Sequence, residues 1–133
     1  MIIEAALVAE LAAAGTTAGA RIYPQPLPQQ ATLPAITYLR VSTLREHTLT
    51  SPDHLPAVRF QLDCWADTLA ETLTLKEEVR VALDGFNADS GLMGGAGGVV
   101  VQACHLDNER AVWSPLPNRY QATLDFIVKH NEP

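Results

Sequence analysis

The chain has 133 residues, of which 47% are hydrophobic and 18% are charged. A chain of this length forms one domain, here expected over 1–133, and buries roughly two thirds of its unfolded surface. Its formal net charge is −6, from nine Lys and Arg against fifteen Asp and Glu, and no window concentrates the basic residues. This charge argues against tight binding of nucleic acid, which requires many cations facing the phosphates.

The hydrophobic runs are too short to predict a membrane span. A bilayer span needs roughly 20 apolar residues. The opening run MIIEAALVAELAAAG carries Glu4 and Glu10 and lacks the basic start of an export signal. We therefore expect a soluble protein that is not exported and does not contact membranes. In such a chain Cys64 and Cys104 are expected to be reduced and buried, not disulfide-bonded.

The first predicted element is an amphipathic helix over residues 2–14. Apolar residues recur there at helical spacing among alanines, and Gly15 follows where a left-handed residue commonly ends a helix. The next segment, ARIYPQPLPQQATLP, contains four prolines. Proline fixes φ and removes a hydrogen-bond donor, so this segment is predicted to be a connector without an inner strand.

Two strands are predicted over 35–45 and 57–66, joined by a long loop at 46–56. Both are rich in β-branched and aromatic residues, and apolar and polar residues alternate in the second. This period of two places Cys64 on the core face and Asp63 on the opposite face. Asp63 is there expected to be solvated or paired with an arginine.

A second helix is predicted to begin at Thr68, because Thr68-Leu69-Ala70-Glu71 has the form of a capping box. It is expected to end near Gly85. The stripe that it turns towards the core is predicted to consist of Leu69, Leu73, Val79, Leu83 and Phe86.

The last third of the chain predicts two more strands, over 98–107 and 119–129, with a proline-bearing connection between them. The glycine-rich GLMGGAGG at 91–98 is predicted to be a flexible turn. A phosphate-binding loop would need a Lys-Ser/Thr ending and a following helix, whereas a strand follows here. The order α-β-β-α-β-β predicts an α+β fold, with a mainly antiparallel four-stranded sheet and two helices packed on one face.

No reactive residues form a convincing catalytic or metal site. The cysteines and histidines lack the close paired spacing of zinc modules, and a cysteine nucleophile would need an exposed thiol beside a histidine. The Ser, Asp and His of SPDH lie in what is predicted to be a loop tip. We therefore expect no catalytic residue, metal or cofactor. Trp65 and Trp113 have two interpretations, as lids on the core or as anchors at a partner surface.

Several motifs occur in a distinctive order over nearly the whole chain. After the N-terminal helix these are GARIYPQPLPQQATLPAITYLRVS, REHTL, VRFQLDCWADTLAETLTLKEEVRVALDGF and RYQATLDFIV. In their order and spacing they resemble the tail completion or tail terminator proteins of long-tailed phages and prophages. The glycine-rich GLMGGAGG departs from the pattern of that family and leaves the conformation of this loop open.

The resemblance implies a structural virion protein and not an enzyme. Proteins of this family form a ring, usually a hexamer, that caps the tail tube, ends its elongation and provides the surface on which the head docks. The implied partners are further copies of the chain, the tail tube protein and a head completion or connector protein. DNA passes through the ring without tight binding. The implied location is the head-proximal end of the tail in the virion, and the host cytoplasm during assembly.

Charged and aromatic residues in the connections are the candidates for contact with a neighbouring subunit or the tube, because interfaces favour exposed groups of this kind. The residues chosen on this basis are Glu46, His47, Arg110 and Trp113. Two alternative functions stay open: a head-side connector or neck protein, and a small-ligand-binding protein or enzyme, which would need a concave polar pocket.

Overall fold

The computed structural model describes residues 2–45, 55–114 and 119–131. In chain order the elements are α1 (Ile3–Ala13), β1 (Ile22–Pro24), β2 (Ala35–Leu44), β3 (Ala57–Ala66), α2 (Leu69–Leu83), the 3-10 turn η1 (Ala88–Ser90), β4 (Leu92–Met93), β5 (Val99–Ser114) and β6 (Arg119–His130). None of the helices in these residues is long and apolar enough to cross a membrane.

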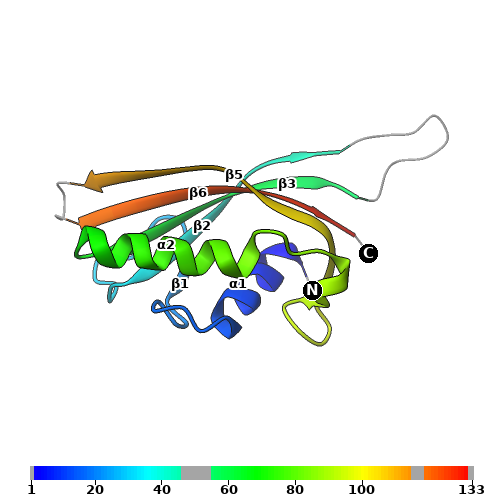
Figure 1. The fold of residues 1–133 in the computed structure, drawn as a ribbon, viewed down its shortest axis with the longest axis horizontal. Coiled ribbons are helices and arrows are strands. Elements are labelled where there is room, and N and C mark those ends of the chain that lie inside the picture. The colour runs from blue at the N-terminus through cyan, green and yellow to red at the C-terminus, as the bar shows by residue number, and fades with distance from the viewer. Residues whose placement is uncertain (1, 46–54, 115–118, 132–133) are drawn as a thin grey trace.

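The strands form one six-stranded sheet in the order β1-β2-β3-β6-β5-β4 (Figure 1). Only β1 and β2 are parallel, and the other neighbouring strands are antiparallel. The predicted α+β class is confirmed, but the predicted four-stranded sheet is wrong, since β1 and β4 add a short strand at each edge. Strands of two or three residues are too short to leave a recognisable alternation in the sequence.

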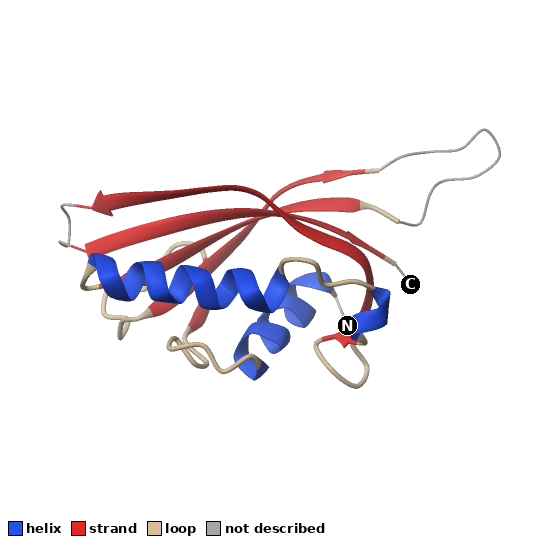
Figure 2. Cartoon of the chain, viewed as in Figure 1, coloured by secondary structure: helices blue, strands red, loops and turns tan. Residues whose placement is uncertain are grey.

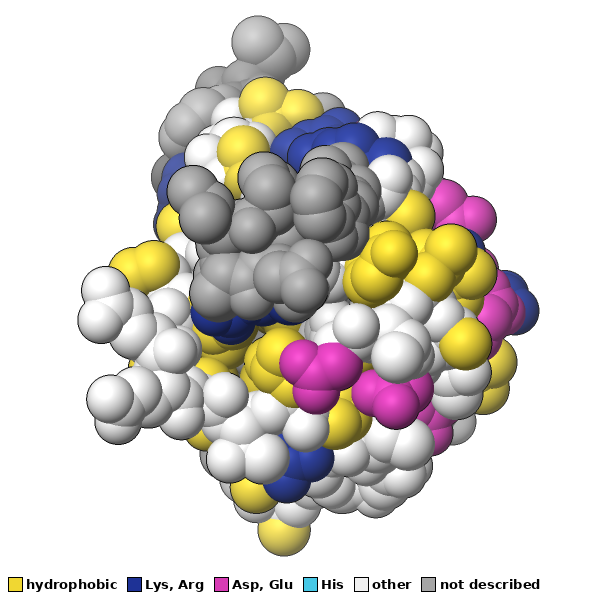
Figure 3. Space-filling view, turned by 90° about the vertical axis from the view of Figure 1, so that its left-hand side faces the viewer, with side chains coloured by type: hydrophobic (Ala, Val, Ile, Leu, Met, Phe, Trp, Pro, Cys, Tyr) yellow, Lys and Arg dark blue, Asp and Glu magenta, His cyan; other side chains and the backbone are white. Residues whose placement is uncertain are grey.

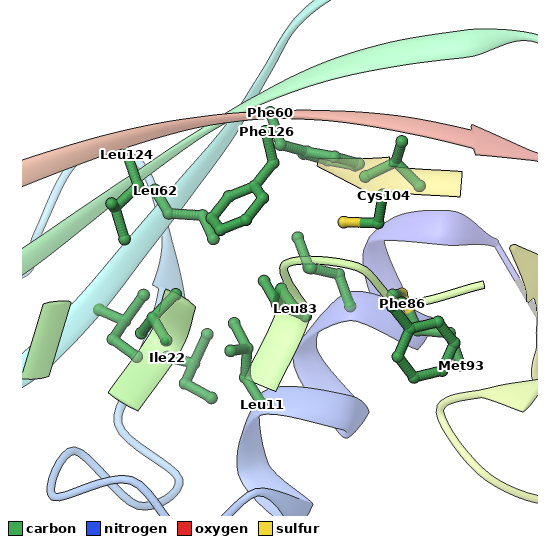
Figure 4. Packing of buried hydrophobic residues seen from close by; sticks show 14 of the residues in the cluster. Leu11, Ile22, Phe60, Leu62, Leu83, Phe86, Met93, Cys104, Leu124 and Phe126 are labelled. Atoms are coloured by element: carbon green, nitrogen blue, oxygen red, sulfur yellow. The ribbon is translucent and has the colours of Figure 1, made fainter. Parts of the chain in front are cut away.

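Both helices lie on the same side of the sheet, and no helix covers its other face in the described residues (Figure 2). The core fills the space between the helices and the sheet. Phe60 of β3 and Phe126 of β6 are register partners there, and both are fully buried. Figure 4 shows them in one cluster with Leu11 of α1 and Leu83 of α2. Burial of this apolar surface is the main stabilising contribution to the fold.

Thr68 caps the start of α2 as predicted, and the later part of the predicted core-facing stripe is buried, but its first two residues are not. The Thr68 hydroxyl accepts a hydrogen bond from the Glu71 amide at 3.2 Å. Thr72, Leu75, Val79 and Leu83 are the residues of α2 that are buried. Leu69 and Leu73, which were predicted to face the core, are 45% and 38% exposed. The helix carries two apolar stripes, and the sheet covers only one of them.

Strand β5 is longer than predicted, because it continues through 108–114, which was expected to be a connection. Its register against β6 shifts between Val101 and Ala103 and again between Leu106 and Asn108. Each β-bulge inserts one residue and reverses which residues face the core. The strand therefore lacks the continuous alternation by which its full length could have been recognised.

The glycine-rich segment 91–98, which was predicted to be a flexible turn, contains the short strand β4 and directly follows η1. Gly94 has a φ of 90°, which favours glycine. Its amide donates a hydrogen bond to Glu10 Oε1 at 3.2 Å, which attaches this segment to α1. Of the other predicted loop, at 46–56, residues 46–54 lie outside the described residues.

Candidate functional site

The four predicted contact residues fall in two parts of the chain. Glu46 and His47 lie outside the described residues. Arg110 is exposed on β5, and its Nη1 lies 3.5 Å from Asp125 Oδ2 on β6. Trp113 belongs to β5, in register with Tyr120, but its side chain is outside the described part. Of the two predicted contact residues that the structure describes, both belong to strand β5.

The sheet face turned away from the helices carries linked ion pairs. Arg59 Nη2 lies 2.8 Å from Asp107 Oδ2, and Arg59 Nη1 lies 3.9 Å from Asp125 Oδ2. Asp125 also faces Arg110, so it connects two arginines. Partly exposed pairs of this kind each contribute about 0 to 1 kcal/mol to stability. Their main effect is to orient charged groups from β3, β5 and β6 on the sheet face that no described helix covers.

Asp63 lies on this same face but is only 1% exposed. The Thr123 hydroxyl donates a hydrogen bond to its carboxylate at 2.6 Å, and the side-chain amide of Gln61 donates a second at 3.2 Å. The side-chain amide of Gln25 donates a third hydrogen bond to the same carboxylate. The prediction that Asp63 is solvated or paired with an arginine is therefore wrong. Gln25 belongs to the proline-rich connector after β1, and the sequence did not indicate that this connector reaches across to β3.

Trp65 is held on the open face of the sheet by two contacts. Its Nε1 donates a hydrogen bond to the Thr37 hydroxyl at 3.0 Å. The Arg119 guanidinium lies 5.6 Å from the centre of a Trp65 ring, within range of a cation–π interaction. The indole is therefore fixed in place beside the Asp63 cluster and does not belong to the core between the sheet and the helices.

A second surface is an open groove along α2, which we call the α2 groove. It consists of two adjoining hollows, of about 620 and 540 Å³, that share Thr74. The first hollow is lined by Ala14, Leu73, Thr74, Glu77, Glu78 and Val81, and the second by Thr17, Leu33, Pro34, Asp67, Ala70, Glu71 and Thr74. Figure 3, which looks onto the end where α2 begins, shows acidic side chains between exposed hydrophobic ones.

Both cysteines are buried and free, as predicted. Burial raises the pKa of the Cys64 thiol far above its usual range and that of Cys104 to about 12. Neither thiol therefore ionises near neutral pH, which makes both poor nucleophiles. Among the described residues, no group of three or more His, Cys, Asp and Glu is placed to hold a metal ion.

Replacing Cys64 by serine is expected to lower the free energy of unfolding by about 1 to 3 kcal/mol, because it buries a hydroxyl in an apolar site. Urea denaturation of the variant beside the wild-type protein measures this loss. Cys64→Ala is the matched control, since it removes the thiol without adding a polar group. Loss of assembly activity at unchanged stability would contradict a purely structural role for Cys64.

The fold and these surfaces define a small α+β protein in which, among the described residues, no helix covers one sheet face and one flank of α2 is exposed. A family model described as "Tail completion protein gp17" matches residues 3–130. The chain therefore belongs to this family and is a structural protein of a phage-type tail.

Comparison with solved structures gives the same fold. The chain is similar to a chain of a structure titled "Virion of native gene transfer agent (GTA) particle", with a TM-score of 0.71 and 14% sequence identity. The similarity covers 98% of this chain and 95% of the other chain. No curated protein matches.

Proposed function

We propose that this protein forms a ring that caps the tail tube, ends tail elongation and provides the surface on which the head docks. The observation that carries the proposal is the family match over residues 3–130, which leaves almost no part of the chain for a separate function. The structural neighbour is part of a virion particle, which is consistent with a chain that works inside such an assembly. In the virion the protein would lie at the head-proximal end of the tail, after assembly in the host cytoplasm.

The proposed partners are further copies of the chain in a hexameric ring, the tail tube protein and a head completion or connector protein. DNA would pass through the ring without being held. The net charge of −6 supports this, because a surplus of carboxylates repels phosphates and favours sliding over binding.

Among the residues proposed to touch a neighbour or the tube, Arg110 has the strongest structural support. It is exposed on strand β5, and its guanidinium lies 3.5 Å from Asp125. Glu46, His47 and Trp113 are proposed on their residue types alone. Charged groups at the rim of an interface mainly affect the rate and the specificity of association.

The capping activity can be tested with purified tail tube protein as it polymerises. Added to growing tubes, this protein is expected to shorten their mean length in proportion to its concentration and to be visible at one tube end in electron micrographs. The heat-denatured protein is the control. Tubes of unchanged length would contradict capping, and binding to the portal complex in place of the tube would favour the head-side connector.

A further inference from the structure

Strand β2 forms one outer edge of the sheet beyond the end of β1. Strand β1 pairs only with residues 36–38 of β2, and no other described strand lies on that side. Residues 39–44 are therefore an edge strand whose outward backbone groups have no strand beside them, and we call them the open edge of β2. Leu39, Val41 and Leu44 are 46 to 63% exposed along it. An exposed hydrophobic strand edge is a template for pairing with another strand.

Strand β5 forms the opposite outer edge of the sheet. Strand β4 pairs only with its first two residues, and the segment after α2 bonds to its backbone as far as Leu106. Among the described residues, no strand pairs with its outer side over 108–114, which we call the open edge of β5. This segment keeps an unbroken register with β6, so it is a regular edge strand. Arg110 and Trp113, two of the predicted contact residues, belong to it.

The strand directions allow one copy of the chain to continue the sheet of another. Along the series β2-β3-β6-β5, each strand is antiparallel to the strand before it. A strand that continues this alternation beside β5 must run in the direction of β2. Strand β2 of a second copy in the same orientation meets this requirement, and copies that follow one another by rotation around a ring keep that orientation.

The two open edges extend towards opposite ends of the sheet. The register across the four long strands places Leu39 level with Asn108. Because β2 and β5 run in opposite directions, 39–44 and 108–114 continue from this level in opposite directions, and in Figure 1 the first ends at the right and the second at the left. Pairing them along their full lengths shifts the second copy along the strands by about five to six residues, or about 18 Å.

This shift fits the geometry of a closed sheet. Four strands that lie about 4.8 Å apart are about 19 Å wide. A shift of about 18 Å over this width tilts the strands by about 45° from the axis of a ring, which is at the upper end of the range of about 35 to 45° in closed β-barrels. The outer strands β2 and β5 also carry β-bulges, which bend a strand and increase its twist.

We propose that the open edge of β5 in one copy of this chain pairs antiparallel with the open edge of β2 in a second copy, so that the copies share one continuous sheet. Arg40 and Arg110 are already paired with Glu4 and Asp125 of their own chain. The contact therefore depends on backbone hydrogen bonds and on the apolar side chains of β2, and it needs no new ion pair.

The contact is head-to-tail, because each copy contributes a different strand and keeps its other open edge for the next copy. Such heterologous contacts produce a closed ring when the rotation between neighbours closes. The inference rests on the proposed ring and identifies the strands that would join its subunits. Barrels of roughly 16 to 18 strands already enclose an aqueous channel, so six copies with four long strands each would leave an open centre.

Cysteine cross-linking with a short bismaleimide tests the pairing in particles that carry the variants. Ser42 and Arg110 are exposed near the middles of the two open edges, on the sheet face turned away from the helices. Within one copy they are about 20 Å apart across the sheet, too far for the reagent. The double variant with Ser42→Cys and Arg110→Cys is therefore expected to form a ladder of covalent oligomers. The native cysteines are buried and stay unreactive.

The matched control replaces Ser42→Cys by Val81→Cys, which is 72% exposed on α2, on the other side of the sheet (Figure 2). Several-fold more oligomer from the test pair than from the control pair supports the edge pairing, and equal yields would overturn it. A covalent dimer formed as efficiently by Arg110→Cys alone would indicate symmetric pairing of two β5 strands and would also overturn it. Ala111→Cys in place of Arg110→Cys repeats the test without removing a charge.

The same particles separate this inference from the proposed function. Tails of normal length in which neither Arg110→Cys nor Ala111→Cys gives a cross-link to Ser42→Cys would overturn the edge pairing and leave the capping function standing. An oligomer ladder from a protein that does not shorten growing tubes would support the edge pairing and contradict capping. A cross-link of Arg110→Cys to the tube protein alone would overturn the choice of a second copy as the partner.

Discussion

Deleting the gene for this protein is expected to leave filled heads that are not joined to tails, together with tail tubes of uncontrolled length. This result follows from the proposed function, because without a cap the end of the tube would keep accepting subunits and the head would lack its docking surface. Electron micrographs of particles from the deletion strain show both effects directly. Tube length is measured as a distribution, and the attached heads are counted.

The control for the deletion is the same strain supplied with the wild-type gene in trans, which should restore tails of uniform length attached to heads. A deletion strain that still makes attached tails of normal length would contradict the terminator function. Tails of normal length that stay detached would favour a connector on the head side, since that result separates length control from joining.

Replacing Phe126 by alanine is expected to lower the free energy of unfolding by about 3 to 5 kcal/mol. Phe126 is fully buried opposite Phe60, in the layer between the sheet and the helices. Its removal forfeits transfer free energy and leaves a cavity that the two central strands cannot close without moving. Small domains are stable by only about 5 to 15 kcal/mol, so the loss is a large part of the total. Urea denaturation measures the change.

The matched control is Leu92→Ala, which truncates a side chain that is already 41% exposed. Such surface changes usually stay within about 0.5 kcal/mol of the wild-type protein. A cost for Phe126→Ala as small as that of the control would mean that this aromatic layer does not stabilise the protein as the structure indicates.

The helices and long strands could be predicted from the sequence wherever one local rule applied without interruption. The alternation in 57–66 placed Cys64 in the core, and Thr68 marked the start of α2. Predictions from alternation failed where the strands are irregular or very short. The bulges in β5 reverse its alternation, and β1 and β4 are too short to show any. The four predicted contact residues all stay predictions: Glu46 and His47 lie outside the described residues, and Arg110 and Trp113 lie on β5 and not in a connection.

The sequence by itself determined the α+β class, the core-facing side of β3 and the membership of a tail completion family, because these depend on local periodicity and on the order of motifs. Only the tertiary structure decided which surfaces remain free. Helical spacing permits two apolar stripes on α2, and which one is buried depends on how the helix packs against the sheet. The burial of Asp63 likewise depends on Gln25, whose connector crosses to a strand 38 residues further along the chain. Which residues are buried at these positions depends on contacts between segments that are distant in the sequence, so it cannot be predicted from a local pattern.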